Sequence, residues 1–369
     1  MAKKQAKLGR LSLSQMKDLI NKKAGVDVAF DLRGENPTEV KDWISTGSRW
    51  LDSIICRGQV AGIPVGKVSE LAGLEGSGKS YMAAQIAGNA QKMGIDVVYF
   101  DAESAIDPVF LEGAGCDLES LLYVQAASVE FVLETIEELL GSNDNRMLFI
   151  WDSLALTPAV MDLEGDFNPQ SSMAVKPRIL AKGMSKITQQ LANSQCTFLV
   201  LNQLKTNITR SPSEAMVEPY VTPGGKAMHY AYSLRIWLTR RKAKAAFITD
   251  VKGFRVGNEV KVTLKKSRFG TDGRQCTFKI MWAGDIGVQD EESWFDAIEG
   301  SEALKRSGAW YELCFEDGTS EKFQSKQWLD KLKDDKFRKR VLNVIDEEVV
   351  MKFENRTGDA SHYYNLEED

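Results

Sequence analysis

A glycine-rich segment that ends in a lysine and a serine is the strongest chemical signal in this sequence. Residues 73–80 fit the phosphate-binding pattern GxxxxGK[ST], with an apolar run before them and a helix-forming run after them. Glycines let backbone N–H groups turn toward phosphate oxygens, and the helix N-terminus adds positive partial charge. Lys79 is expected to reach the β- and γ-phosphates, and Ser80 to ligate Mg²⁺. The predicted nucleotide-binding residues are Gly73, Leu74, Glu75, Gly76, Ser77, Gly78, Lys79, Ser80 and Tyr81.

Two acidic side chains follow apolar runs at positions where they could serve the same site. Asp152 ends the run Met147–Trp151 and is expected at the second Mg²⁺ position. Glu103 lies 24 residues after Lys79, and a carboxylate there could polarise water for attack on a γ-phosphate. The alternative is that Glu103 caps a helix N-terminus, a role that Asp101 could fill instead. Spacing alone does not decide between these two interpretations.

Short apolar runs alternate with helical stretches between residues 41 and 284, which we expect to form one α/β domain. The first four runs are separated by segments long enough for helices, which is typical of a mostly parallel, twisted sheet with helices on both faces. The later runs lie closer together and indicate an antiparallel extension. The runs are Val65–Leu71, Val97–Phe100, Met147–Trp151, Thr197–Leu201, Leu234–Leu238 and Val260–Leu264.

Shorter segments flank this domain on both sides. Residues 1–40 are expected to form an arm, in which 11–24 is a helix and Val26–Phe30 alternates like a short strand. Residues 285–345 are expected to form a small α+β domain, because apolar side chains recur there at roughly helical spacing. Residues 346–369 are expected to be an acidic tail. The recurring apolar residues are Trp328, Leu332, Phe337, Val341 and Ile345.

Composition excludes several classes of protein. The 369 residues carry a net charge of −5 and are 43% hydrophobic, as in a soluble globular protein. No apolar stretch approaches the roughly 18 residues that span a bilayer, and no apolar segment of a secretory signal follows the basic N-terminus. Five scattered cysteines without a CxxC pair argue against disulfides and zinc, and favour a reducing cytosol. The basic start and acidic end fit nucleic-acid binding, and equally fit solvated termini.

Several further motifs closely resemble those of RecA recombinases. They occur in the family's order over about residues 40–345, a set far more specific than a phosphate loop alone. Within the family, Lys266-Ser267-Arg268 looks closer to phage UvsX-type recombinases. The motifs are Ile44–Ser48, Asp101–Pro108 (DAESAIDP), Asp152–Pro158, Asn202-Gln203, Gly224–Ala227 and Ser307–Tyr311.

The resemblance implies a RecA-type core and an ATP-dependent, Mg²⁺-dependent DNA recombination and repair protein. Such a protein forms a helical filament on single-stranded DNA, pairs it with homologous double-stranded DNA, and hydrolyses ATP when DNA stimulates it. The arm of residues 1–40 then looks like a polymerisation element that binds the next subunit. The alternative is a free basic arm that contacts DNA. A single-strand-binding or loader protein is a further expected partner, in the cytoplasm of a bacterium or of a phage-infected host.

The resemblance also assigns roles to individual residues. Glu103 looks like the water-activating glutamate, and Gln203, just after the fourth strand, looks like the γ-phosphate sensor. Asp107 and Phe110 resemble the residues that flank adenine, although the family often has tyrosine at the second position.

Lys266 and Arg268 resemble paired cations that reach a neighbouring subunit's ATP. Arginine at the second position, where the family commonly has lysine, keeps the charge and permits bidentate phosphate contact.

Two segments resemble the DNA-binding loops of the family. Residues 164–175 look like the first, with Met173 placed to wedge between bases. After it, Pro177 suits the first turn of a helix. On that helix Arg178, Lys182 and Lys186 fall at i, i+4 and i+8 and form one basic stripe, which could follow a phosphate backbone. Taken alone, such a stripe is more often a solvated face.

Residues 204–225 look like the second loop, since Lys205–Pro223 shows little periodicity. The residues that it offers to DNA are Lys205, Arg210, Gly224 and Gly225. His229 is expected to be packed or close to phosphate, without a metal.

Two other functions share this kind of core. A hexameric DNA helicase normally has a separate N-terminal collar, for which residues 1–40 are too short. A recombination mediator that binds ATP without hydrolysing it would not need all of Lys79, Ser80, Glu103 and Asp152.

Overall fold

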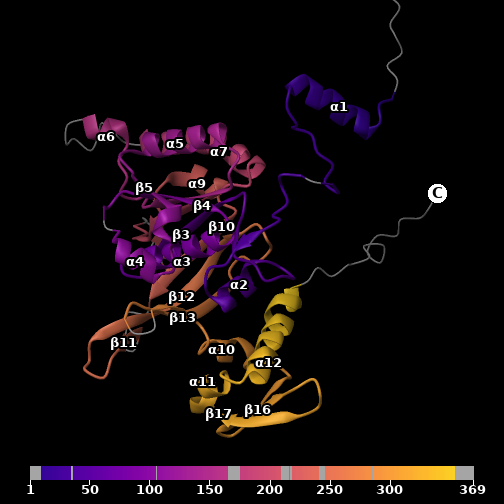
Figure 1. Cartoon of the computed structure of the whole chain (residues 1–369), viewed down its shortest axis with the longest axis vertical. Coiled ribbons are helices and arrows are strands. Elements are labelled where there is room, and N and C mark those ends of the chain that lie inside the picture. Colours follow the sequence, from indigo (N-terminus) through magenta and orange to yellow (C-terminus); the bar gives the residue numbers. More distant parts are fainter. Residues whose placement is uncertain are drawn as a thin grey trace, which may run out of the picture. The chain divides into compact units, whose positions relative to one another are not determined.

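The computed structural model describes residues 10–34, 36–104, 106–164, 175–208, 216, 218–240, 246–283 and 286–353. The chain divides into two compact units, residues 1–41 and residues 42–369 (Figure 1). Within the described residues, no helix is both long and apolar enough to cross a membrane.

The described part of the first unit, residues 10–34 and 36–41, contains one helix, α1 (Leu13–Ala24). It begins where Ser12 and Gln15 form a capping box, and it ends at Gly25, whose φ of 74° is favourable for glycine. The Asn21 side chain binds the backbone of Val28 and Ala29, which holds the following segment extended. Val26–Phe30 is not a strand in this chain, because no neighbouring backbone pairs with it; the prediction of a strand there was wrong for the isolated chain.

A large sheet forms the centre of the second unit. Five parallel strands lie side by side in the order β3 (Val68–Gly73), β7 (Thr197–Gln203), β6 (Met147–Asp152), β4 (Asp96–Asp101) and β5 (Leu121–Gln125). On the other side of β3, the strand β10 (Leu234–Arg240) is also parallel to it. The predicted parallel sheet is confirmed. Apolar periodicity missed β5, because most of its side chains are half-exposed or exposed.

The antiparallel extension begins one strand later than the sequence suggested. β12 (Arg255–Ser267) pairs antiparallel with β10, and β13 (Gln275–Met281) and β14 (Gly287–Gln289) continue the sheet, while β11 (Phe247–Thr249) also pairs with β12. Because β14 belongs to this sheet, the core reaches beyond the predicted boundary at residue 284.

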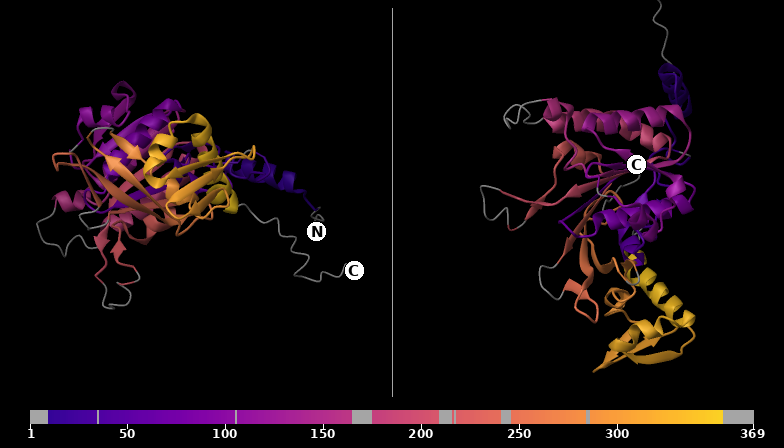
Figure 2. Two further views of the ribbon diagram at one scale, coloured as in Figure 1. Left: turned by 90° about the horizontal axis from the view of Figure 1, so that it is seen from below. Right: turned by 60° about the vertical axis from the view of Figure 1, so that its left-hand side comes forward.

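Helices cover both faces of the sheet, which explains the continuous apolar runs (Figure 2). One face packs against α2 (Arg49–Ile55), α3 (Lys79–Lys92) and α4 (Pro108–Gly113). The other packs against α5 (Val129–Ser142), α7 (Val175–Asn193) and α9 (Gly225–Ala231). Along β4, Val97 and Tyr99 enter the first core, and Val98 and Phe100 enter the second.

Short elements complete the second unit. β1 (Trp43–Ile44) pairs with β2 (Ile63–Pro64), and β8 (Lys205–Thr206) pairs with β9 (Tyr220–Val221). The helix α6 (Val160–Glu164) precedes residues 165–174, which lie outside the described part of the chain.

The C-terminal part has its own apolar core and an antiparallel sheet of β15 (Leu304–Ser307), β16 (Trp310–Cys314) and β17 (Ser320–Gln324). Three helices, α10 (Trp294–Ile298), α11 (Trp328–Lys331) and α12 (Asp335–Ile345), pack on it. Residues 346–353 continue α12 as helical turns, with Val350 buried and Asp346 paired with Arg49. The predicted acidic tail therefore does not begin at residue 346.

Candidate functional site

The phosphate loop joins β3 to α3 with the geometry that anion binding requires. Gly76 and Gly78 have φ values of 63° and 87°, which other residues rarely adopt. The helix α3 begins at Lys79 and has no side-chain cap, whereas Ser128 caps α5 and Asp334 caps α12. The first N–H groups of α3 are therefore open to an anion.

Lys79 lies over this loop. Its ammonium donates to the carbonyl oxygens of Gly73 at 3.3 Å and Leu74 at 3.2 Å. Burial lowers the pKa of Lys79, and the carboxylates of Asp152, Glu103 and Glu75 oppose that shift. The phosphate loop follows β3, Asp152 ends β6 and Glu103 follows β4, so all three predicted groups lie at the same edge of the parallel sheet.

Asp152 ends β6 beside the end of β4, so its carboxylate reaches the edge of the sheet. Tyr99 donates to it at 3.0 Å. Burial raises the pKa of Asp152, while hydrogen bonds from Ser80 and Tyr99 oppose the shift. A hydroxyl and a carboxylate fit Mg²⁺, which usually takes one or two protein ligands together with phosphates and waters. The described residues contain no cluster of three or more His, Cys, Asp or Glu that could hold a metal by itself.

The structure separates the roles that spacing left open for Asp101 and Glu103. Asp101 organises the turn after β4, since its carboxylate accepts from the N–H groups of Glu103 at 2.8 Å and Ile106 at 3.3 Å. Glu103 caps no helix. Its carboxylate accepts instead from the Ser153 hydroxyl at 3.2 Å, next to Asp152. Glu103 is thus available for chemistry at this edge.

Gln203 is the last residue of β7 and lies opposite Gly73, not after the strand as predicted. The residue before it, Asn202, is buried and donates to Glu70 at 3.1 Å and to the Pro223 carbonyl at 2.9 Å. Gln203 therefore lies beside the start of the phosphate loop. The hydrogen bond from Asn202 to Pro223 connects the end of β7 to the end of the 204–225 segment.

A buried ion pair that sequence reasoning missed supports the same region. Arg235 on β10 donates to Glu70 on β3 at 2.6 Å and to Thr222 at 2.9 Å. Thr222 also contacts the half-buried His229 at 3.2 Å, and the expected choice for His229 between packing and a position close to phosphate stays open. The sequence did contain a signal for this pair: Glu70 and Arg235 each lie inside an apolar run. Because buried charges are usually paired, the two residues could have been predicted to bind each other.

Of the two residues predicted to flank adenine, Phe110 lies near Tyr81 at the start of α3. Phe110 packs edge-on against Tyr81, with 5.5 Å between ring centroids. Asp107 caps α4 by accepting from the Val109 N–H at 3.0 Å. The Tyr81–Phe110 pair packs on the core next to the phosphate loop, and the Asp107 carboxylate already has a structural partner.

Lys266 and Arg268 bind the C-terminal end of α9 in the single chain. Lys266 donates to the carbonyl of His229 at 2.7 Å, and Arg268 donates to that of Tyr230 at 2.6 Å. Such cations favour a helix C-terminus. Burial and the nearby charges of Arg268 and Arg235 lower the pKa of Lys266.

The two predicted DNA loops are described only in part. Met173 and Arg210 lie outside the described residues. Lys205 is exposed in β8, whose ladder with β9 gives the 204–225 segment an ordered base that the lack of periodicity did not indicate. Gly224 and Gly225 have φ values of 112° and 78° and start α9, so glycine is needed at both.

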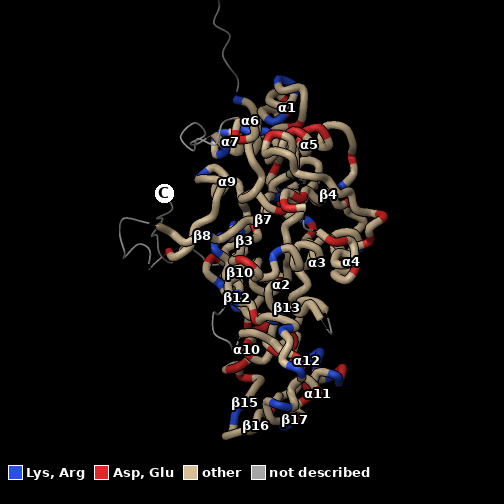
Figure 3. Tube along the Cα trace, turned by 90° about the vertical axis from the view of Figure 1, so that its left-hand side faces the viewer, with Lys and Arg blue, Asp and Glu red and all other residues tan. Residues whose placement is uncertain are grey.

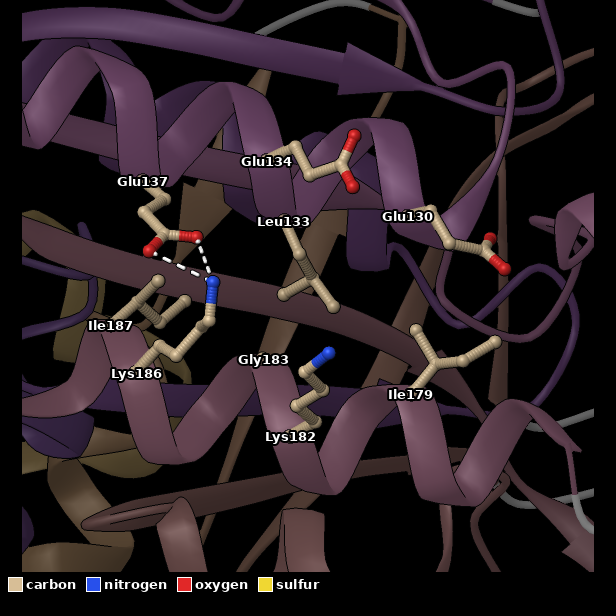
Figure 4. Close-up of a pocket in the computed structure, with 9 residues that line it drawn as sticks. All are labelled: Glu130, Leu133, Glu134, Glu137, Ile179, Lys182, Gly183, Lys186 and Ile187. Carbon is tan, nitrogen blue, oxygen red and sulfur yellow. Dashed lines mark hydrogen bonds and ion pairs between the residues drawn. The ribbon is translucent and has the colours of Figure 1, made fainter.

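The predicted basic stripe on α7 lies along an acidic stripe on α5 (Figures 3 and 4). Lys186 forms an ion pair with Glu137 at 2.8 Å. A cavity of about 170 Å³ lies between the two helices where they pack together, and Lys182 lines it together with Glu130 and Glu134. A DNA phosphate would have to compete with these carboxylates at Lys182 and Lys186. Arg178, which is exposed one turn from the start of α7, does not line that cavity.

Comparisons with known proteins show which family this chain belongs to. The profile of the RecA N-terminal domain matches residues 11–287. The chain is 31% identical over 278 residues to Protein RecA of Marinobacter nauticus, covering 75% of this chain and 76% of that protein. It is 32% identical over 279 residues to Protein RecA of Rubrobacter xylanophilus, with the same coverage. The relative from Streptomyces avermitilis is 31% identical over 278 residues, which cover 75% of this chain and 70% of that protein.

These relatives are bacterial, and the closer resemblance to phage recombinases stays a prediction. The matched region contains the phosphate loop, Glu103, Asp152 and Gln203. Because the profile and the relatives span most of the chain, this protein belongs to the RecA family of recombinases.

Proposed function

We propose that this protein forms a helical filament on single-stranded DNA and catalyses homologous pairing and strand exchange, with ATP hydrolysis stimulated by DNA. ATP and Mg²⁺ are its proposed cofactors, single-stranded and homologous double-stranded DNA its substrates, and the cytoplasm its location. The observation that supports the proposal is the meeting of three groups at one edge of the sheet: Lys79 lies over the phosphate loop, Asp152 ends β6, and Ser153 next to it donates to Glu103.

Each of these residues has a distinct proposed task. Lys79 and the open N-terminus of α3 would hold the β- and γ-phosphates, and Ser80 with Asp152 would hold Mg²⁺. Glu103, oriented by the Ser153 hydroxyl, would take a proton from the attacking water. Mg²⁺ would supply charge neutralisation on the phosphates.

One experiment tests the proposal against its alternatives. We expect single-stranded DNA to stimulate ATP hydrolysis, and negative-stain images with ATP and DNA to show helical filaments. A hexameric helicase would instead form rings and unwind duplexes, and a mediator would assemble without hydrolysis. The absence of DNA-stimulated hydrolysis by the wild-type chain would reject the recombinase proposal.

We further propose that Lys266 and Arg268 complete the ATP site of a neighbouring subunit in the filament. Both cations lie close enough to the protein surface to reach a neighbour, since Lys266 is half-buried and Arg268 is exposed. Mixing the Lys266→Ala/Arg268→Ala double variant with Glu103→Gln subunits should restore part of the hydrolysis that each lacks alone. Two folded variants that co-assemble and regain no activity would show that the site is not shared.

A further inference from the structure

The first turn of α7 is fastened to the turn that follows Asp152. The ammonium of Lys176 donates to three backbone carbonyls, those of Leu154 at 2.5 Å, Ala155 at 3.4 Å and Thr157 at 2.7 Å. An ammonium has three N–H donors, so all of them are used. Lys176 is half-buried, and its contacts provide partners for carbonyls of a turn that has no regular ladder. The three carbonyls thus form a binding site that the Lys176 ammonium fills.

The turn held by Lys176 is continuous with the catalytic edge. Its first residue, Ser153, donates to the Glu103 carboxylate at 3.2 Å. The turn is internally braced, because the Thr157 N–H donates to the Ser153 carbonyl and the Thr157 hydroxyl accepts from Trp151. A displacement of the carbonyls at 154–157 would therefore be carried to Ser153 and to the carboxylate that it orients.

Both loop ends meet this turn. The helix α7 starts directly after residues 165–174, and α9 starts where the 204–225 segment ends. A Cβ atom on Gly225 would lie 3.2 Å from Pro177, and one on Gly224 would lie 3.4 Å from Leu154. The helices α7 and α9 lie side by side (Figures 1 and 3). We call the contact of Leu154, Lys176, Pro177, Gly224 and Gly225 the loop junction.

We propose that Lys176 is a positioning residue that transmits DNA binding at the two loops to Glu103 through the loop junction. This inference rests on the proposed function. DNA bound at the two loops would fix the first turn of α7, and the ammonium would fix the 154–157 carbonyls with it. Ser153 would then hold Glu103 in its hydrolytic position. The Lys176 side chain is engaged inside the protein, unlike that of the exposed Arg178 two residues later.

The chemistry of this amine provides a readout that a purely structural residue would lack. Burial lowers the pKa of Lys176 to about 8; Asp162 on α6 opposes the shift, and Lys205 on β8 reinforces it. An uncharged amine has only two N–H donors and cannot bind all three carbonyls. An arginine at this position stays charged at all working pH values.

The experiment compares Lys176→Met, Lys176→Arg and the wild type, with Lys92→Met as a control that removes an exposed charge on α3. Nucleotide affinity, single-stranded DNA affinity and DNA-stimulated ATP hydrolysis are measured for each full-length protein. We expect Lys176→Met to keep both affinities within about twofold and to lose about tenfold of the stimulated turnover, because a displaced catalytic group slows the reaction. Lys176→Arg should recover most of that turnover, and Lys92→Met should match the wild type.

A pH series adds the second readout. Between about pH 7 and about pH 9, stimulated turnover should fall more in the wild type than in Lys176→Arg. Parallel pH profiles, or full stimulated turnover in Lys176→Met, would overturn the role of Lys176. So would a loss of DNA affinity in Lys176→Met that matches its loss of turnover, since Lys176 would then be a DNA contact. A wild type without DNA-stimulated hydrolysis would reject the proposed function itself, which keeps the two failures distinct.

Discussion

The buried carboxyl group of Asp52 should make the stability of this protein depend on pH in an unusual direction. Asp52 lies on α2 with 5% of its surface exposed. It accepts from the Ser45 hydroxyl at 2.6 Å and from the Thr46 hydroxyl and N–H at 2.6 and 3.0 Å. Burial nevertheless dominates and raises the pKa of Asp52 from 3.8 to about 7, to which the charge of Asp290 also contributes.

The sign follows from proton binding. Between about pH 4 and pH 7 the folded chain keeps the Asp52 proton that the unfolded chain has lost, so stability falls as pH rises. Each pH unit corresponds to about 1.4 kcal/mol, so the two units between pH 5 and pH 7 amount to about 3 kcal/mol. Above pH 7 the contribution of Asp52 no longer changes.

The variant Asp52→Asn removes this titration while keeping the size of the side chain. Urea unfolding followed by tryptophan fluorescence should show the free energy of unfolding of the variant, relative to wild type, rising by about 3 kcal/mol from pH 5 to pH 8. The control Asp144→Asn changes an exposed carboxylate and should show no such trend. A constant difference between Asp52→Asn and wild type across this range would refute the reasoning.

Three further predictions concern function. Glu103→Gln should still bind nucleotide but lose about two or more orders of magnitude in the rate of hydrolysis, whereas Lys79→Ala should lose nucleotide binding and hydrolysis together. Titration with a fluorescent nucleotide measures binding, and phosphate release measures hydrolysis. Removal of residues 1–32 should leave a chain that binds ATP but forms no filament, because the core has its own sheet and phosphate loop; undiminished light scattering with ATP and no DNA would contradict this. Arg178→Ala should weaken single-stranded DNA binding and reduce its salt dependence more than Lys186→Ala does, because Lys186 is already paired with Glu137. Equal losses of DNA affinity for the two variants in a salt titration would argue against this ranking.

Local sequence patterns were sufficient for the phosphate loop and for most of the central sheet. The glycines at 76 and 78 and the residues Lys79 and Ser80 act through backbone geometry and a helix end, which a window of eight residues encodes. Buried parallel strands can also be recognised in the sequence as apolar runs, because both of their faces are covered by helices. The strand β5 escaped notice because its exposed side chains break that pattern.

Tertiary structure decided which partner each polar side chain takes. Asp101 and Glu103 lie two residues apart, and the sequence does not distinguish them. In the structure, Asp101 accepts from the backbone of its own turn, whereas Glu103 accepts from Ser153, in the turn that follows the neighbouring strand. Likewise, a basic stripe on α7 looks the same in sequence whether it faces water, DNA or the acidic side of α5.

The same reason applies to Lys176. Its three carbonyl acceptors come from a turn about twenty residues away in sequence, and the close approach of α9 to α7 completes the loop junction. Spacing along the chain encodes backbone conformation because that depends on near neighbours. The pairing of charges and hydrogen bonds between elements depends on how the elements pack, and that is settled only when the sheet and its covering helices are assembled.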